Sequence, residues 1–260
     1  IAIAIHAIGD ATVRSALDAL TPVVGMTTAP NRIEHLQFVD PSDVGRFRDL
    51  GVVASVQPIH LRGDARWARA GLGDRAERIG YAWRSVAGRG GMLAFGADAP
   101  YEDVDPWPGL AIAVTRADPS WPKGDTFGAH EAVTLEMAIR AHCLHPALAG
   151  GERERGRLTS GYWADLMVVP AAAIDEPTGA GGALSTTRPR LVLVDDFAPG
   201  CDAGTAAQLL AVLRGVARDG AGIVVAGRFA TRLSVGADLA DVCTRCLTLV
   251  AGRLEPASDL

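Results

Sequence analysis

Four short apolar runs, each followed by polar residues, set the pattern of the first hundred residues; they are 1–8, 32–38, 51–57 and 91–97. Side chains alternate between the two faces of a strand, so the first run places Ile3 and Ile5 on one face. Ala4 and His6 then share the other face, and the last run separates bulky from small residues in the same way. A bulky face and a small face are typical of parallel strands that have helices on one side and line a barrel on the other.

Helical patterns separate these apolar runs. Residues 11–20 carry an apolar stripe with the helical period, and Asp10 before them is the expected N-cap. A short helix is expected after residues 40–42 and a longer one over 74–88. The residues expected to face inward from these helices are Val13, Ala16, Leu17, Leu20, Val44, Phe47, Leu50, Ile79, Ala82, Trp83 and Val86. The alternation of strand and helix predicts an α/β fold, which we interpret as the C-terminal half of a TIM-like (β/α)8 barrel.

The chain changes character after residue 98. A loop rich in proline and tryptophan leads to a helix from Thr134 to about Gly150, and the turn-and-strand segment GRLTSGYWADLMVVP follows. A linker of small residues at 178–187 precedes the strand RPRLVLV, after which the pattern reads helix, strand, helix, strand. We therefore expect three parts, which are half of a barrel (1–150), a small β-domain segment (151–195) and an αβ extension (196–260).

Composition narrows the possible functions. The chain has 25 Lys and Arg against 30 Asp and Glu, a formal net charge of −5, which does not favour nucleic-acid or anionic-membrane partners. No run approaches the roughly 20 apolar residues of a spanning helix, and the opening segment lacks the basic flank of a signal peptide, so a cytoplasmic location is expected. Cys243 and Cys246 form one C-x-x-C without a second pair or a nearby histidine, which favours reduced thiols over a zinc or redox site.

Three candidate metal ligands close apolar strands, and they are His6, His35 and Asp98. The carboxyl ends of parallel strands meet at one edge of a sheet, where barrel enzymes place their chemistry, so we expect these side chains to lie together. Imidazole and carboxylate groups are suitable ligands for zinc and similar metals. Any one strand histidine has an alternative explanation as a core residue with satisfied hydrogen bonds. Three such strand ends in successive units make coincidence the weaker explanation.

The predicted sheet has open edges. Parallel strands that lack neighbours on both sides of the sheet are unfavourable in a soluble protein. Residue 1 is Ile rather than Met, and the chain begins inside a strand. We therefore expect an incomplete chain, whose missing half-barrel comes from upstream sequence or from another chain.

Several motifs occur along the chain in a fixed order, and they are HAIGDATVRSALDAL, NRIEHLQFVDPSDVGRFRDLGVVASVQPIHLRGD, YAWRSVAGRGGMLAFGADAP and GRLTSGYWADL. Together they resemble the amidohydrolase superfamily, most closely its exoenzyme-like branch of metal-dependent amide and N-formyl hydrolases. The resemblance implies that His6, His35 and Asp98 hold a divalent metal, with zinc favoured, and that Asp98 also acts as general base. It further implies hydrolysis of a non-peptide C–N bond in a small molecule, such as an N-formyl compound or a cyclic amide.

Other residues of these motifs have expected roles as well. His60 and Asp64 lie in QPIHLRGD, beyond the third strand, where a loop would roof the pocket. We assign His60 to catalytic contacts with substrate or transition state, the alternative being a surface histidine. Arg84 is either a contact for a substrate carboxylate or a solvated helix residue. Histidines outside the ligand pattern are His130, His142 and His145. The chain lacks the family's H-x-H pair and its fourth-strand ligand, so we expect poor metal affinity from this chain alone.

The C-terminal segment from LVLVDD onward has a second, weaker resemblance, to the end of an ABC-transporter ATPase. Asp195 would face magnesium, and Asp196 would stand where a glutamate base is usual. No G-x-x-x-x-G-K-[ST] loop is present to bind phosphate, which favours a degenerate segment without ATP binding. An unrelated αβ extension is the alternative. The alternative function for the whole chain is therefore a non-catalytic, ABC-ATPase-related partner or regulatory protein.

Overall fold

The computed structural model describes residues 1–175, 184–187, 191–195, 211, 222–226, 247–250 and 253–256. The chain divides into two compact units. The first contains Ile1–Tyr162 and Ala171–Thr187, and the second contains Trp163–Pro170 and Arg188–Leu260. The division at residues 150 and 195 that we expected from the sequence stays a prediction.

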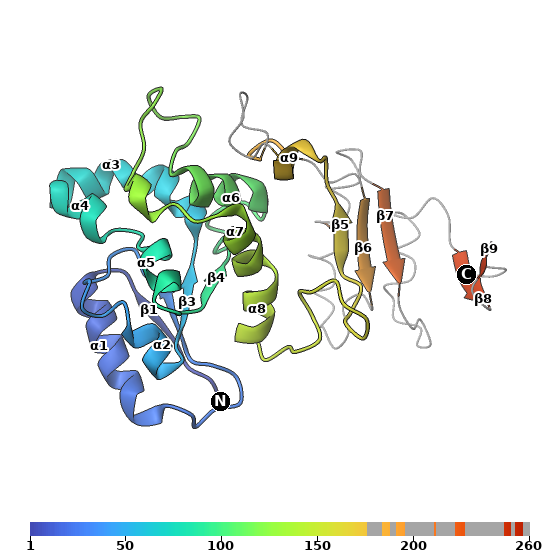
Figure 1. The fold of residues 1–260 in the computed structure, drawn as a ribbon, viewed down its shortest axis with the longest axis horizontal. Helices are drawn as coiled ribbons and strands as arrows, with labels where there is room; N and C mark the ends of the chain where they lie inside the picture. The colour runs from blue at the N-terminus through green and yellow to red at the C-terminus, as the bar shows by residue number, and fades with distance from the viewer. Residues whose placement is uncertain are drawn as a thin grey trace. The chain divides into compact units, whose positions relative to one another are not determined.

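A parallel sheet forms the centre of the first unit (Figure 1). Its strands are β1 (Ala4–Ala7), β2 (Arg32–His35), β3 (Val53–Val56) and β4 (Leu93–Phe95). They lie side by side in sequence order, and every neighbouring pair is parallel. This arrangement confirms an α/β fold with a parallel sheet. That the sheet is half of a barrel stays a prediction.

The first helices of this unit connect the strands. They are α1 (Asp10–Leu20), η1 (Thr21–Val23), α2 (Arg46–Leu50), η2 (Pro58–His60), α3 (Leu61–Leu72), α4 (Asp74–Ile79) and α5 (Trp83–Gly88). The expected stripe of α1 is buried in full, because α1 packs against β1 and α2. The prediction that Asp10 is the N-cap of this helix was wrong, because Gly9 holds that position. Asp10 is the first residue of the helix and forms an ion pair with Arg75. The first isoleucines are also less buried than expected, since Ile1 and Ile3 precede β1 and are exposed.

The helix expected over 74–88 is interrupted. Gly80 has extended backbone (ψ 134°) and Tyr81 a left-handed one (φ 53°), so α4 ends and α5 begins in a new direction. Residues 79, 82, 83 and 86 are nevertheless all buried, as their apolar spacing predicts.

The later helices of the unit are α6 (Pro106–Thr115), η3 (Ala129–Glu131), α7 (Leu135–His142), α8 (Leu144–Ala149) and α9 (Ala172–Asp175). Thr134 caps α7, because its side chain accepts a hydrogen bond from the backbone N–H of Met137 at 3.2 Å. The helix expected to continue to Gly150 breaks at Cys143; Pro146, which has no N–H to bond the carbonyl of residue 142, lies in the next turn. In α8, Ala149 packs against Val53 and Ala94 on the small face of the sheet.

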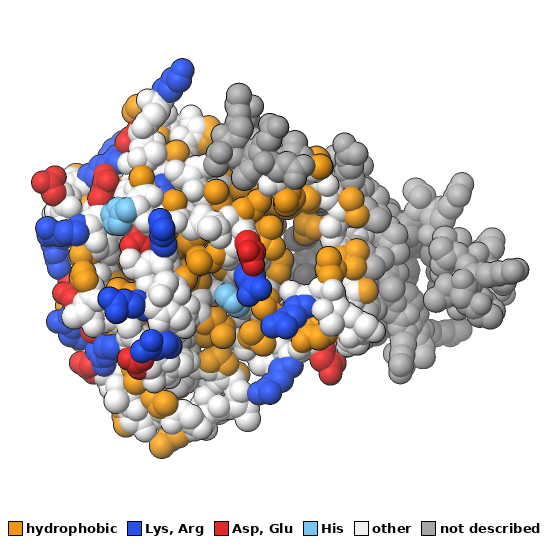
Figure 2. All heavy atoms as spheres, in the orientation of Figure 1, with side chains coloured by type: hydrophobic (Ala, Val, Ile, Leu, Met, Phe, Trp, Pro, Cys, Tyr) orange, Lys and Arg blue, Asp and Glu red, His pale blue; other side chains and the backbone are white. Residues whose placement is uncertain are grey.

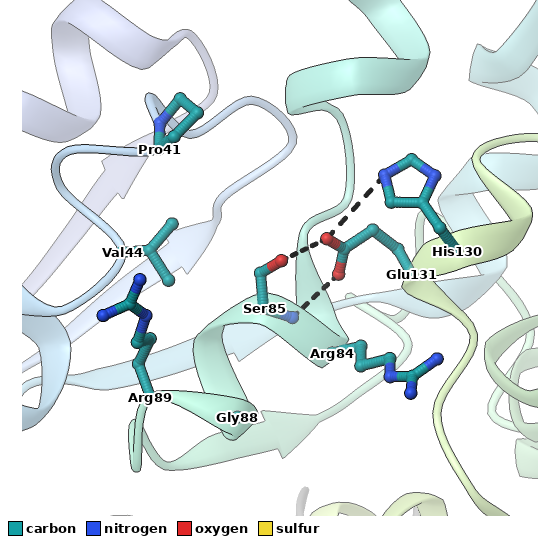
Figure 3. Close-up of a pocket in the computed structure, with 8 residues that line it drawn as sticks. All are labelled: Pro41, Val44, Arg84, Ser85, Gly88, Arg89, His130 and Glu131. Atoms are coloured by element: carbon teal, nitrogen blue, oxygen red, sulfur yellow. Dashed lines mark hydrogen bonds and ion pairs between the residues drawn. The ribbon is translucent and has the colours of Figure 1, made fainter.

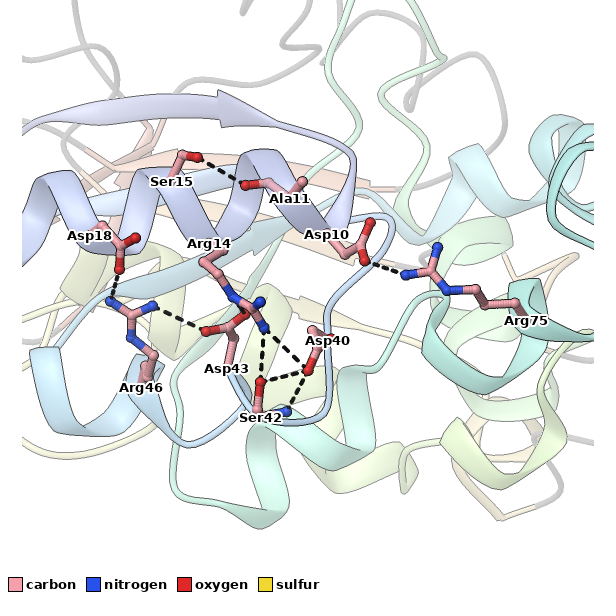
Figure 4. A network of polar contacts seen from close by, with 10 residues as sticks. All are labelled: Asp10, Ala11, Arg14, Ser15, Asp18, Asp40, Ser42, Asp43, Arg46 and Arg75. Carbon is pink, nitrogen blue, oxygen red and sulfur yellow. Dashed lines mark hydrogen bonds and ion pairs between the residues drawn. The ribbon is translucent and has the colours of Figure 1, made fainter.

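A polar network ties α1 to α2 (Figure 4). Asp43 is 3% exposed and accepts hydrogen bonds from Nε of Arg14 at 2.8 Å and from Nη1 of Arg46 at 3.1 Å. Arg46 also reaches Asp18 on α1, with its Nη2 2.6 Å from Oδ1. One buried carboxylate therefore fixes the turn before α2 against the outer face of α1.

The described residues of the second unit form two groups of strands. In the first, β6 (Leu191–Asp195) lies between antiparallel β5 (Leu166–Val168) and parallel β7 (Gly222–Ala226). In the second, β8 (Leu247–Val250) pairs antiparallel with β9 (Arg253–Pro256). Asp195 ends β6, while Asp196, Cys243 and Cys246 lie outside the described residues.

Two surface properties bear on possible partners. Among the described residues, no helix has both the length and the apolar character needed to cross a bilayer. On the face drawn in Figure 2, basic and acidic side chains are interspersed rather than gathered by sign.

Candidate active site

The structure brings together four side chains singled out from the sequence. His6 lies in β1 and His35 ends β2, and their ring centroids are 4.2 Å apart. His60 ends η2, directly after β3, and its ring is 5.8 Å from that of His35 in a stacked arrangement. Asp98 follows β4, and its Oδ2 lies 4.0 Å from Nε2 of His60. His6, His35 and Asp98 therefore lie at the carboxyl ends of their strands, as the sequence predicts, and His60 lies in the helical turn after β3. The roles of all four residues stay predictions.

The side chains of this cluster differ in exposure. His60 is buried, with 6% exposure, whereas His6 is exposed and the Asp98 side chain is 47% exposed. The buried atoms Nδ1 of His35 and Nε2 of His60 have no hydrogen-bond partner. Buried polar atoms are normally satisfied, so these two nitrogens indicate a site built for a ligand.

The chemical groups of this cluster are of the types that bind a divalent metal. Imidazole nitrogens and a carboxylate are typical zinc ligands, and two of the nitrogens are without partners. The geometry is looser than a closed metal centre: among the residues that the structure describes, no three His, Cys, Asp or Glu side chains are arranged to hold an ion.

Burial sets the protonation of His35. The pKa of its imidazole is lowered, first because burial disfavours the charged ring and then because of the neighbouring charge of His6; Asp98 opposes the shift. His35 is therefore held in the neutral form, which is the form that can bind a metal.

Two of the four residues have left-handed backbone. His35 has φ 75° and Asp98 has φ 59°, conformations that side chains with a Cβ adopt at a cost. Leu36 continues the turn with φ 48°. Such conformations concentrate at functional sites, where the surrounding structure holds them.

Sequence reasoning missed Gln57, which follows β3 and is 7% exposed. Its buried Oε1 has no partner, like the two histidine nitrogens. Gln57 ends the third apolar run just as the other candidates end theirs, but a lone glutamine there did not indicate any particular chemistry. Tyr101 is a second missed neighbour, with 77% exposure and a ring centroid 5.3 Å from that of His60.

Arg84 lies at a different pocket, of about 410 Å³, none of whose lining residues belongs to the histidine cluster (Figure 3). Glu131 is buried there and accepts hydrogen bonds from the backbone N–H of Ser85, at 2.9 Å, and from its hydroxyl. His130 lines the same pocket and Arg84 is exposed at its rim. These positions give no support to Arg84 as a contact in the histidine cluster.

An apolar cavity of about 300 Å³ is lined by residues that neighbour His60 and Asp98 in the sequence. It is lined by Pro58 and Ile59 before His60, and by Gly96, Ala97 and Ala99 around Asp98. The wall opposite belongs to α6, and His142 of α7 also lines it. Burial lowers the pKa of His142, so this histidine contributes a neutral ring.

The chain is similar to known proteins over the same region. The amidohydrolase family profile matches residues 1–195. Protein LONG AFTER FAR-RED 3 of Arabidopsis thaliana is 34% identical over 179 residues, which are 67% of this chain and 30% of that protein. YtcJ of Bacillus subtilis (strain 168) is 29% identical over 168 residues, 64% of this chain and 32% of that protein.

The chain is also similar to a solved structure. An uncharacterized metal-dependent hydrolase from Pyrococcus furiosus is 29% identical, with a TM-score of 0.52, over 62% of this chain and 32% of that chain. The chain thus spans only about a third of the length of the relatives it matches. Since the family match runs from residue 1 to residue 195, through both the sheet and the candidate site, the chain belongs to the amidohydrolase family.

Proposed function

We propose that this chain provides part of the active site of a metal-dependent hydrolase that cleaves non-peptide C–N bonds. The observation that carries the proposal is the meeting of His6, His35, His60 and Asp98 at one edge of a parallel sheet, with two buried nitrogens unpaired. The family and the similarity to a metal-dependent hydrolase support the reaction class. An N-formyl compound or a cyclic amide is the proposed substrate class.

Each residue of the cluster has a proposed role in binding the metal or in catalysis. His6 and His35 would hold the metal through ring nitrogens, and Asp98 would complete this side of its coordination. A bound divalent ion such as zinc activates water at neutral pH and polarises a carbonyl. Asp98 would accept the proton from the attacking water at a carboxylate oxygen, since its side chain is accessible. His60 would orient the substrate carbonyl through its unpaired Nε2.

We propose that further strands, from upstream sequence or another chain, complete the sheet. Among the described strands of the first unit, β1 pairs only with β2 and β4 only with β3. The edge of β4 is partly occupied, because Nδ1 of His145 lies 2.7 Å from the carbonyl oxygen of Leu93. Unpaired parallel edges are unfavourable, so added strands would stabilise the unit and supply the missing ligands.

Metal binding and hydrolysis test the proposal together. Zinc uptake is measured by mass spectrometry and calorimetry on the chain, alone and with the polypeptide encoded upstream. Hydrolysis is assayed with N-formyl amino acids and hydantoins. We expect weak zinc binding by the chain alone, and tighter binding with turnover once the sheet is completed.

Matched variants separate the site from the scaffold. His35→Ala should lower turnover by more than about 100-fold, since even outer-shell changes cost 10–100-fold at metal sites. His130→Ala, at the other pocket, should leave it unchanged. Full zinc occupancy and turnover in His35→Ala would show that the metal assignment is wrong.

A further inference from the structure

Asp64 links the loop after β2 to α3. Its Oδ2 accepts two hydrogen bonds, one from Nε2 of Gln37 at 2.8 Å and one from the hydroxyl of Tyr81 at 2.9 Å. Asp64 lies in the first turn of α3, four residues after His60, and it is only partly exposed. A single carboxylate oxygen thus connects the segment that follows His35 with the helix that follows His60.

Gln37 is held a second time, through its backbone. Its carbonyl oxygen accepts the N–H of Tyr81 at 2.7 Å. Gln37, two residues after His35, is therefore bonded to Asp64 through its side chain and to Tyr81 through its main chain.

Tyr81, which bonds to both Gln37 and Asp64, is itself anchored in the core. Tyr81 is 1% exposed, and its carbonyl accepts a hydrogen bond from Nη1 of Arg116 at 3.2 Å. The guanidinium of Arg116 is fully buried, donates from Nε to the carbonyl of Phe127 at 2.8 Å and stacks 4.4 Å from the ring centroid of Trp83. Gln37 is therefore tied to a part of the core that cannot shift easily.

The ring of His35 is not fixed by a hydrogen bond at its buried nitrogen. Nδ1 of His35, the nitrogen that is free for a ligand, has no hydrogen-bond partner. The orientation of the ring therefore depends on the neighbouring rings of His6 and His60 and on its backbone, which is left-handed at both His35 and Leu36 and would relax if released.

We propose that Asp64 is a positioning residue, which holds the His35–Gln37 turn through Gln37 and so keeps the His35 ring between those of His6 and His60. The inference rests on the proposed function only in taking His35 as a ligand. The positioning itself is a property of the chain without metal. Asp64 touches neither the substrate nor the metal in this scheme.

Side-chain NMR of the full chain, labelled in histidine, tests the proposal. The readout is the nuclear Overhauser contact between the ring protons of His6 and His35, whose centroids lie 4.2 Å apart. Asp64→Leu removes the acceptor, and Gln37→Met removes only the donor. Asp64→Asn is the matched control, because one amide oxygen can still accept both hydrogen bonds.

We expect the His6–His35 contact to be lost in Asp64→Leu and Gln37→Met and kept in Asp64→Asn. Zinc affinity should fall about 10–100-fold in the first two variants and remain near wild type in the third. An unchanged ring contact in folded Gln37→Met would overturn the proposal. So would global unfolding of Gln37→Met by tryptophan fluorescence, because the link would then support the fold rather than the ring. If wild type binds no zinc, the metal assignment fails, and the ring contacts alone decide the positioning role.

Discussion

Nε2 of His60 lies 4.0 Å from Oδ2 of Asp98, although the two residues follow different strands of the sheet. The distance is too long for a hydrogen bond, so neither group satisfies the other. Nε2 of His60 is buried without a partner, while the Asp98 side chain is half-exposed. A water or substrate atom beside the pair could bond to both groups, as the proposed function requires.

The first prediction concerns Asp98. Asp98→Asn should lower kcat/KM of the completed enzyme by about 100-fold or more, because an amide cannot accept the proton that a general base removes. The measurement is initial-rate hydrolysis of an N-formyl substrate. Asp103→Asn is the control, since Asp103 is exposed and its Oδ1 only accepts a backbone N–H. Equal losses in both variants would argue against a special role for Asp98.

The second prediction compares the two glycines of the GRLTSG segment. Both have left-handed backbone, with φ 78° at Gly156 and φ 90° at Gly161. A Cβ at Gly156 would meet the carbonyl oxygen of Cys143 and Cα of Leu144, each at 2.6 Å, whereas a Cβ at Gly161 meets nothing within 4 Å. Gly161→Ala should cost about 1 kcal/mol from backbone strain, and Gly156→Ala about 1–3 kcal/mol more from the clash. Urea unfolding of the two variants measures the difference; equal costs would contradict it.

The strands of the sheet could be predicted from the sequence because the patterns that indicate them are local. Strand ends, apolar runs and helical stripes are read within one segment, and all the residues expected to face inward from α1 and from α4 and α5 are buried. Helix ends were harder to predict. The break at Gly80 and Tyr81 depends on Tyr81 bonding to Gln37, a contact over more than forty residues that periodicity does not show.

The third prediction concerns the network between α1 and α2. Asp43→Ala should lower the free energy of unfolding by about 1–3 kcal/mol, because it removes a buried acceptor of two arginine hydrogen bonds. Asp18→Ala is the matched control: it removes a bond to the same Arg46, but the Asp18 side chain is 64% exposed, and the loss should be within about 0.5 kcal/mol. Chemical unfolding at neutral pH measures both, and a larger loss at Asp18 would reverse this ranking.

The candidate site was only partly predictable. His6, His35 and Asp98 could be named because each ends an apolar run, and His60 because of its motif. Gln57 has the same location, but a lone glutamine carries no chemical signal until its buried oxygen is seen to lack a partner. The support of the His35 turn by Asp64 was also hidden, since it joins two loops through Gln37 and Tyr81.

The last prediction is a pH dependence of stability set by His142. Burial lowers the pKa of His142 in the folded chain below its ordinary value near 6.5, so the unfolded chain binds a proton more readily. Its contribution to stability is therefore fully present above pH 6.5 and is lost as the pH falls through the folded pKa. In His142→Gln, the free energy of unfolding should therefore fall less steeply as the pH drops below about 6.5. Some of the fall should remain, because burial also lowers the pKa of His35. Urea unfolding across this range measures the slope, with His130→Gln as an exposed control. If the slope of His142→Gln matched that of wild type, His142 would have to titrate alike in the folded and unfolded chains, and its burial beside the apolar cavity would not govern its charge.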